Sequence, residues 1–109
     1  MGLATARAQL CNPRDVSKRL KLELLVDTCP LYIWVKRSRL EKLGVEPMGR
    51  RRFRTNDGRV VERDIGEAVV ECLSGKATTI VVFAEESDNE VLSLHALEGL
   101  GMNPATQAL

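Results

Sequence analysis

The chain of 109 residues has few aromatic side chains, few cysteines and almost no histidine. Aromatic residues make up 4% of it, so a core has to be built mostly from Leu, Val, Ile and Ala. The three cysteines are odd in number and far apart, without a Cys-x-x-Cys motif, and the single His95 has no cysteine near it in the sequence. This pattern argues against a zinc site and favours free thiols in a reducing cytoplasm.

Strong net charge and long apolar runs are absent as well. The formal net charge is +1 with 28% charged residues, which gives no overall field for nucleic acid or an anionic membrane. No apolar stretch approaches the length of a bilayer span, and the first residues lack the basic start and apolar block of a secretory signal. We therefore expect a single cytoplasmic domain over residues 1–109, with neither nucleic acid nor membrane as a partner.

Alternating apolar and polar residues predict strands in the first part of the chain. Residues 3–11 and 19–26 both alternate, and the turn-forming residues 12–15 separate them. From Leu24 the alternation gives way to a continuous apolar run, which is typical of a strand covered on both faces. Asp27 ends this run. An ionised aspartate costs several kcal/mol to bury unless it is paired, so either a structural turn or a catalytic neighbour has to accept it.

The remaining residues predict further strands and two short helices. Ser38 and Glu41 have the spacing of a capping box, and Gly44 suits the end of the first helix. The expected elements are a strand at 31–35, a helix at 37–44, a hairpin from 50 to 72, an apolar strand at 78–84, a brief strand at 91–92 and a helix at 94–100. The fold class is therefore mainly β.

The predicted hairpin has its tip at Asn56, Asp57 and Gly58, residues that a tight turn with positive φ favours. Its first arm is rich in arginine. Arg and Phe53 together suit nucleic acid, but on a strand the charges alternate between two faces and the acidic residues of the opposite arm can pair with some of them. We expect a solvated arm. The acidic loop at residues 85–88 lacks the ligand spacing of a calcium loop, so we expect an ordinary loop there.

The order of these elements resembles that of a known family. The resemblance rests on Leu-Leu-Val-Asp-Thr at residues 24–28, the helix after it, the hairpin from Phe53 to Val60, the apolar strand at 80–83 and Val-Leu-Ser-Leu-His-Ala-Leu-Glu at 91–98. In these features the chain resembles the retropepsin-like aspartic proteases, in particular the small single-domain relatives of the retroviral enzymes that occur in bacteria and archaea. The resemblance implies a retropepsin-like closed β-barrel with two short helices and a flap hairpin.

The resemblance also implies an activity and an assembly. Peptide hydrolysis by two carboxylates requires one to act as a base on water while the other holds a proton. Asp27-Thr28 is the only Asp-Thr or Asp-Ser pair in the chain, so the second carboxylate would come from a second copy in a two-fold homodimer. Asp27 would then be catalytic, Thr28 and Cys29 would form the active-site loop and brace the dimer, and Asn56, Asp57 and Gly58 would close over a peptide substrate. Neither a metal nor a cofactor is implied.

Three positions depart from the pattern of the family. The family has glycine after Asp-Thr, where this chain has Cys29 followed by Pro30, and Ser93 replaces the glycine of the second signature. Pro30 restricts Cys29 and removes a backbone donor, whereas Ser93 is small and can cap the helix after it. A catalytically weak or inactive dimer that binds extended peptides or scaffolds a partner is therefore the alternative function.

Cys29 leaves two further alternatives open. The first is a catalytic dyad of Cys29 with His95, the only histidine, because a cysteine nucleophile needs a base or a lowered pKa. Against this dyad stands the interpretation of His95 as a surface or packed histidine. A disulfide between the Cys29 residues of two copies is the second alternative.

Overall fold

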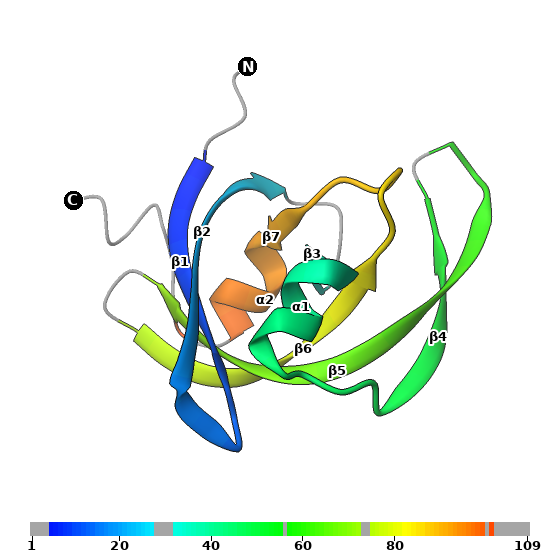
Figure 1. Cartoon of the computed structure of the whole chain (residues 1–109). Coiled ribbons are helices and arrows are strands. Elements are labelled where there is room, and N and C mark those ends of the chain that lie inside the picture. The colour runs from blue at the N-terminus through cyan, green and yellow to red at the C-terminus, as the bar shows by residue number, and fades with distance from the viewer. Residues whose placement is uncertain (1–4, 28–31, 56, 73–74, 100, 102–109) are drawn as a thin grey trace.

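The computed structural model describes residues 5–27, 32–55, 57–72, 75–99 and 101 of the chain. Strands predominate, which confirms the mainly β class (Figure 1). The elements are β1 (Thr5–Asn12), β2 (Asp15–Asp27), β3 (Ile33–Lys36), α1 (Arg37–Leu43), β4 (Gly49–Arg54), β5 (Val60–Cys72), β6 (Gly75–Ala84), β7 (Val91–Ser93) and α2 (Leu94–Gly99).

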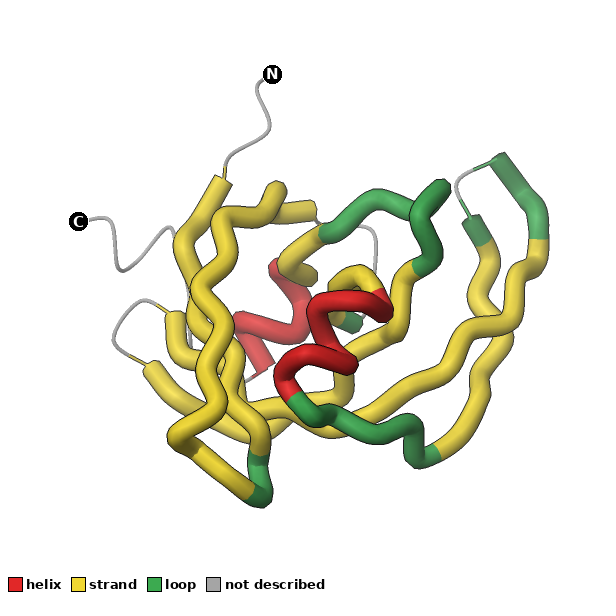
Figure 2. The backbone as a smooth tube through the Cα atoms, viewed as in Figure 1, coloured by secondary structure: helices red, strands yellow, loops and turns green. Residues whose placement is uncertain are grey.

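The seven strands form one sheet in the order β1-β2-β7-β3-β6-β5-β4, with a further pairing of β1 to β5. The pairs β2–β7 and β3–β6 are parallel and the other pairs are antiparallel. The pairing of β3 with β7 is a single bridge between Trp34 and Val91. The sheet curves around the region that holds both helices (Figure 2). Full closure of a barrel wall and the homodimer stay predictions.

The alternation in β1 and β2 gives each strand one buried face. Leu22 and Leu24 are buried, whereas Lys21 and Glu23 between them are exposed. In the antiparallel register Ala8 lies opposite Leu22, so both strands direct apolar side chains to the same core. The predicted strands are confirmed, although β2 begins at Asp15 rather than residue 19.

The turn between β1 and β2 is tied to the first helix through Asn12. The Asn12 Nδ2 donates to the Leu43 carbonyl at 3.0 Å, and its Oδ1 accepts the Arg14 backbone N–H at 2.8 Å. This buried side chain therefore satisfies one of the carbonyls that the end of α1 leaves unpaired. Gly44 ends α1 in the left-handed conformation with φ 83°, as predicted.

The predicted capping box of the first helix is wrong. The N-cap is Lys36 and no side-chain capping bond is present, because α1 begins at Arg37 and Ser38 already lies inside its first turn. Instead, the Lys36 backbone N–H donates to the Glu90 carboxylate at 2.9 Å, and the Arg39 guanidinium lies 3.5 Å from the same carboxylate. An acidic residue before β7 thus stabilises the start of α1.

The core consists mainly of aliphatic side chains from β1, β2, β3, β5, β6, β7 and both helices. Its largest fully buried members are Phe83, Leu10, Ile33, Leu40, Leu92 and Leu97. Gly66 on β5 permits a close approach, since a Cβ there would lie 2.9 Å from the Glu46 carbonyl oxygen. Cys11 and Cys72 are buried free thiols, as expected, whereas Cys29 lies outside the described residues.

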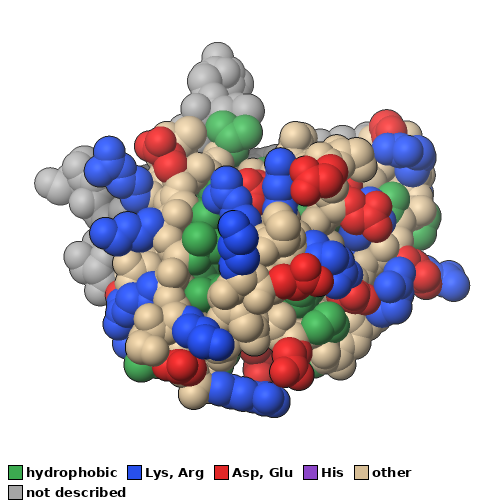
Figure 3. Space-filling view, in the orientation of Figure 1, with side chains coloured by type: hydrophobic (Ala, Val, Ile, Leu, Met, Phe, Trp, Pro, Cys, Tyr) green, Lys and Arg blue, Asp and Glu red, His purple; other side chains and the backbone are tan. Residues whose placement is uncertain are grey.

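Charges of both signs are mixed over the surface that Figure 3 shows, in agreement with the small net charge. Within the part of the chain that the structure describes, no helix is long and apolar enough to cross a membrane.

Candidate active site

Asp27 is the last residue of β2, and β2 runs parallel to β7. The paired positions are Leu25 with Val91, Val26 with Leu92, and Asp27 with Ser93. Because the strands are parallel and pair over these last residues, their carboxyl ends lie together, and the chain leaves them into residues 28–31 and into α2. The backbone of the predicted catalytic residue is therefore placed beside the second signature, 66 positions away in the sequence. Thr28 and Cys29 lie outside the described residues.

Ser93 is fully buried and caps the second helix. Its Oγ accepts the backbone N–H of Ala96 at 3.1 Å, which is the bond of an N-cap residue to the third helical position. This contact confirms the predicted cap. The serine that replaces the glycine of the second signature thus stabilises the start of α2, directly beside the end of β2.

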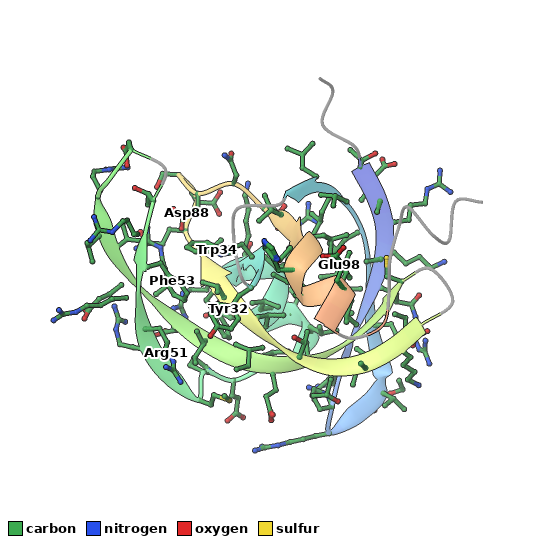
Figure 4. The ribbon with its side chains drawn as sticks, turned by 180° about the vertical axis from the view of Figure 1, so that it is seen from behind. Tyr32, Trp34, Arg51, Phe53, Asp88 and Glu98 are labelled. Carbon is green, nitrogen blue, oxygen red and sulfur yellow. The ribbon has the colours of Figure 1, made fainter. Side chains whose placement is uncertain are left out.

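Three aromatic side chains lie on one side of β3, between this strand and the β4 arm of the hairpin. Phe53 on β4 makes edge-to-face contacts with Trp34 on β3, at a centroid distance of 5.1 Å, and with Tyr32, at 5.9 Å. Figure 4 shows the three rings gathered between these two elements. We call Tyr32, Trp34 and Phe53 the aromatic cluster. Its members are partly buried, and they connect the segment at residues 32–36 to the hairpin.

The hairpin formed by β4 and β5 turns at Asp57 and Gly58, two of the three residues of the predicted tip. The Gly58 N–H donates to the Thr55 carbonyl, the Thr55 N–H donates to the Arg59 carbonyl at 2.8 Å, and Gly58 has φ 87°. The Asp57 carboxylate accepts the Thr55 hydroxyl and, at 3.0 Å, the Arg59 guanidinium. These bonds, the Thr55 hydroxyl above all, hold the pKa of Asp57 below its ordinary value. Asp57 therefore shapes the tip, while Asn56 lies outside the described residues.

Arg63 on β5 fastens the hairpin to the loop between β6 and β7. Its Nε donates to Asp88 Oδ2 at 2.7 Å and its Nη2 to Asp88 Oδ1 at 3.1 Å, in a bidentate pair with side-chain exposures of 11% and 15%. Asp88 also accepts the Glu85 backbone N–H at 2.8 Å. The Arg63 guanidinium holds the pKa of Asp88 below its ordinary value, and the same contact raises the pKa of Arg63. The acidic loop is thus used to hold the hairpin.

Asp64, the next residue, fastens the hairpin to α1. Its carboxylate accepts the Arg37 guanidinium of α1 and, at 3.0 Å, the Arg50 guanidinium of β4. These arginines, Arg37 first, lower the pKa of Asp64. Arg52 lies 3.5 Å from Glu62 on the opposite arm. The predicted pairing of arginines with acidic residues across the hairpin is confirmed for Asp64 and Glu62, whereas Arg63 pairs outside the hairpin.

Comparison with known proteins gives a clear result for the fold. No family model matches the sequence and no curated protein matches it. The solution structure of simian foamy virus (mac) protease matches with a TM-score of 0.61 at 17% identity, covering 93% of this chain and 99% of that one. The EIAV protease in complex with the inhibitor HBY-793 matches with a TM-score of 0.54 at 16% identity, covering 94% and 91%. The chain shares the fold of the retroviral proteases.

The retropepsin-like fold that the sequence led us to expect is therefore confirmed, from viral structures. A bacterial or archaeal affinity stays a prediction, as does every catalytic role. In this retroviral-protease fold, Asp27 ends the second strand, and β4 and β5 form the long hairpin.

Thiol or metal chemistry gains no support from the described residues. His95 is exposed on α2. Burial raises the pKa of the Cys72 thiol, which makes it a poor nucleophile. Among the residues that the structure describes, no group of His, Cys, Asp and Glu could hold a metal ion.

A cavity of about 710 Å³ lies elsewhere in the fold, between β1, β2 and the ends of β5 and β6. Its described lining is Arg7, Ala8, Gln9, Lys21, Leu22, Glu23, Glu71, Cys72, Gly75 and Lys76. Asp57 and Gly58, the predicted site residues whose surroundings the structure describes, are not among them.

Sequence reasoning missed two members of the aromatic cluster. Tyr32 and Trp34 alternate with the buried Ile33 and Val35, so their spacing places them on the face of β3 away from the core. That alternation was the available signal. It does not say what faces them, because Phe53 reaches them from another part of the chain.

Proposed function

We propose that the chain is an aspartic endopeptidase whose catalytic dyad is formed by Asp27 from each of two copies. The observation that carries this proposal is the position of Asp27 at the end of β2, paired with β7, in a fold shared with the retroviral proteases. One Asp-Thr pair per chain requires a second copy to supply the second carboxylate, and two-fold dimers are the commonest assemblies of soluble chains.

In the proposed reaction the two aspartates share one proton, because two carboxylates within hydrogen-bonding distance of each other cannot both ionise. The ionised one removes a proton from water, whose oxygen attacks the peptide carbonyl carbon. The protonated one donates its proton to the carbonyl oxygen. The tetrahedral intermediate then breaks its C–N bond. The aspartate that took the proton from water gives it to the nitrogen, and the other aspartate removes a proton from one hydroxyl of the intermediate. The products are a carboxylic acid and an amine, and the pair again shares one proton. Neither a metal nor a cofactor takes part.

The other predicted residues have supporting roles in this proposal. Thr28 hydrogen-bonds across the two-fold axis, and Cys29 supplies the backbone amide that faces the carboxylate. Asn56, Asp57 and Gly58 at the hairpin tip close over an extended peptide, which binds through strand-like backbone hydrogen bonds. Arg63 and Asp88 support this by holding one arm of the hairpin to the loop that leads into β7.

Cys29, Pro30 and Ser93 favour a second candidate function. These residues replace small or backbone-donating positions of the family pattern. A dimer that keeps the cleft and the hairpin but has lost hydrolysis binds extended peptides or scaffolds a partner. If Cys29 is the impediment, Cys29→Gly raises the rate of hydrolysis.

The deciding experiment is the digestion of a mixed peptide library, read by mass spectrometry from mildly acidic to neutral pH with a reductant present. The wild type is compared with Asp27→Asn and with Glu23→Gln, which removes an exposed carboxylate from the same strand. We expect cleavage by the wild type and Glu23→Gln and none by Asp27→Asn. If wild type and Cys29→Gly are both inert while sedimentation shows folded dimers, the endopeptidase is refuted and the peptide-binding dimer stands.

A further inference from the structure

The aromatic cluster is unusual in a chain that has so few aromatic residues. The chain contains one Trp, one Tyr and two Phe. Phe83 is fully buried in the core, whereas Tyr32, Trp34 and Phe53 are only partly buried and are not members of the core cluster. Large aromatic side chains contribute most to stability when they are buried. Three of the four aromatic side chains of this protein are thus left with part of their surface free for contact with something else.

Arg51 lies on the same face of β4 as Phe53, since side chains two residues apart on a strand share a face. Its partner in the register of the hairpin is Arg63. Like charges directly opposite each other destabilise a pair of strands. Asp88 at 2.7 Å and Glu85 at 3.8 Å compensate the charge of Arg63. Within the described ranges Arg51 itself has no ion pair, and its exposed guanidinium is available to a ligand.

The other face of the same hairpin shows the contrast. There Arg50 lies 3.0 Å from Asp64 and Arg52 lies 3.5 Å from Glu62. Acidic residues thus pair with Arg50 and Arg52 on the face away from the aromatic cluster, whereas Arg51 beside the cluster and Arg54 at the end of the strand have no ion pair in the part of the chain that the structure describes. An anionic group of a bound ligand would give Arg51 an ion-pair partner on the face of the aromatic cluster.

We propose that Arg51 and the aromatic cluster select peptides in which an acidic residue stands two positions from an aromatic or large aliphatic residue. The large side chain packs on Tyr32, Trp34 and Phe53, and the acidic side chain pairs with Arg51. The spacing follows from the geometry of strands: same-face side chains of an extended peptide repeat every second residue, about 7 Å apart, which is also the spacing of Phe53 and Arg51. This inference rests on the proposed function in one respect, namely that the chain binds extended peptides.

A single-stranded nucleic acid offers similar chemistry, because bases stack on aromatic rings and phosphates pair with arginine. It needs a continuous positive track along the backbone. Here Asp64 and Glu62 neutralise the neighbouring Arg50 and Arg52, and the net charge is only +1. The surface therefore favours a peptide with one acidic side chain, and an oligonucleotide serves as a control ligand.

The test uses Trp34, the single tryptophan of the chain, as a fluorescent reporter inside the site. Asp27→Asn protein, which is expected to bind without cleaving, is titrated with blocked alanine-based peptides that carry Glu-Ala-Phe or Phe-Ala-Glu. Matched peptides have Gln in place of Glu, or Glu directly next to Phe. The wild type is titrated in parallel, with mass spectrometry to verify intact peptide. We expect binding to be about two- to five-fold tighter for one of the spaced Glu peptides than for its Gln counterpart, the range for an exposed ion pair.

Two arginine variants locate the effect. Arg51→Gln is expected to remove the preference for Glu over Gln without lowering the unfolding temperature, because the substitution also relieves the repulsion with Arg63. Arg54→Gln is the matched control, since it removes an exposed charge from the same strand on the opposite face. It is expected to leave the preference intact.

The inference is overturned by equal affinity for Glu and Gln peptides, by an equal effect of Arg54→Gln, or by a Trp34 response to oligothymidylate alone. It is also overturned if Trp34 fluorescence changes with protein concentration and peptides have no further effect, because a second copy then covers the cluster. Selective binding without cleavage by the wild type would refute the endopeptidase and leave this inference standing. Cleavage without any preference for Glu would support the endopeptidase and refute this inference.

Discussion

The pair of Arg63 and Asp88 gives the sharpest prediction about stability. Asp88→Asn keeps the shape of the side chain and removes its charge. Arg63, whose side chain is 11% exposed, then keeps only Glu85 at 3.8 Å as an acidic partner. Removing one partner from a fully buried ion pair costs about 3–5 kcal/mol, and an exposed pair contributes about 0–1 kcal/mol. Since this pair is nearly buried and Glu85 remains, we expect the free energy of unfolding to fall by about 2 kcal/mol.

Urea unfolding, followed by Trp34 fluorescence and by far-ultraviolet circular dichroism, measures this loss. With a slope of about 1–3 kcal/mol per molar urea, the midpoint is expected to fall by about 1 M. Protein concentration has to be the same for all variants, because association would add to the apparent stability. Arg52→Gln is the matched control, since Arg52 and Glu62 are 79% and 53% exposed, and its effect is expected to stay within about 0.5 kcal/mol.

A loss in Asp88→Asn no larger than that in Arg52→Gln would refute the reasoning that a buried bidentate pair holds the hairpin. The double variant Arg63→Met with Asp88→Leu adds a second check. Replacing both partners of a buried pair with apolar residues is often close to neutral, so the double variant is expected to be more stable than Asp88→Asn. If it is less stable, the hydrogen bonds and packing of these two side chains contribute more than their charges.

Three further predictions concern the same scaffold. The arginine partners of Asp64 and Asp88 lower the pKa values of these carboxyls. The stability that the pairs contribute is therefore complete above the unfolded pKa of about 4 and is lost as the pH falls through the lower folded pKa values. Acid unfolding curves should show that the stability of Asp88→Asn depends less on pH below about 4 than that of the wild type. Ser93→Ala removes the cap of α2 and should lower the free energy of unfolding by about 1 kcal/mol in urea unfolding, whereas no loss would contradict the cap. Gly66→Ala places a Cβ 2.9 Å from the Glu46 carbonyl oxygen and should cost about 1–3 kcal/mol, whereas Gly49→Ala, with nothing within 4 Å, should leave the melting temperature unchanged; equal melting temperatures would contradict the tight packing.

Local patterns in the sequence predicted much of the fold. The alternation that buries Leu22 and Leu24, the αL residue Gly44 and the turn at Gly58 depend on neighbours a few residues away, so they can be read from one chain. The start of α1 could not, because its stabilising partner is Glu90, 54 positions along the chain. Local spacing suggested a capping box at Ser38, and a tertiary contact took its place.

In the candidate site, too, the features that depend on contacts between distant residues could not be predicted from local patterns in the sequence. The position of Asp27 beside the second signature was expected only through resemblance to a family, since nothing local in β2 specifies β7 as its neighbour. The aromatic cluster joins residues 32 and 34 to residue 53 across a loop and a helix, so no periodicity in the sequence marks it. The role of Asp88 was likewise hidden, because an acidic loop looks solvated until its arginine partner is known.

The parallel pairing of β2 with β7 determines when the end of β2 that carries Asp27 can assemble during folding. Asp27 acquires its neighbour in β7 only when residue 93 is in place, so the end of β2 depends on a strand that lies 66 positions further along the chain. Strand pairings between residues this far apart in sequence form slowly, because the entropy cost of closing a long loop comes before any stabilising contact is made. Until residue 93 has been synthesised and has paired, Asp27 therefore lacks the neighbouring strand that fixes its backbone.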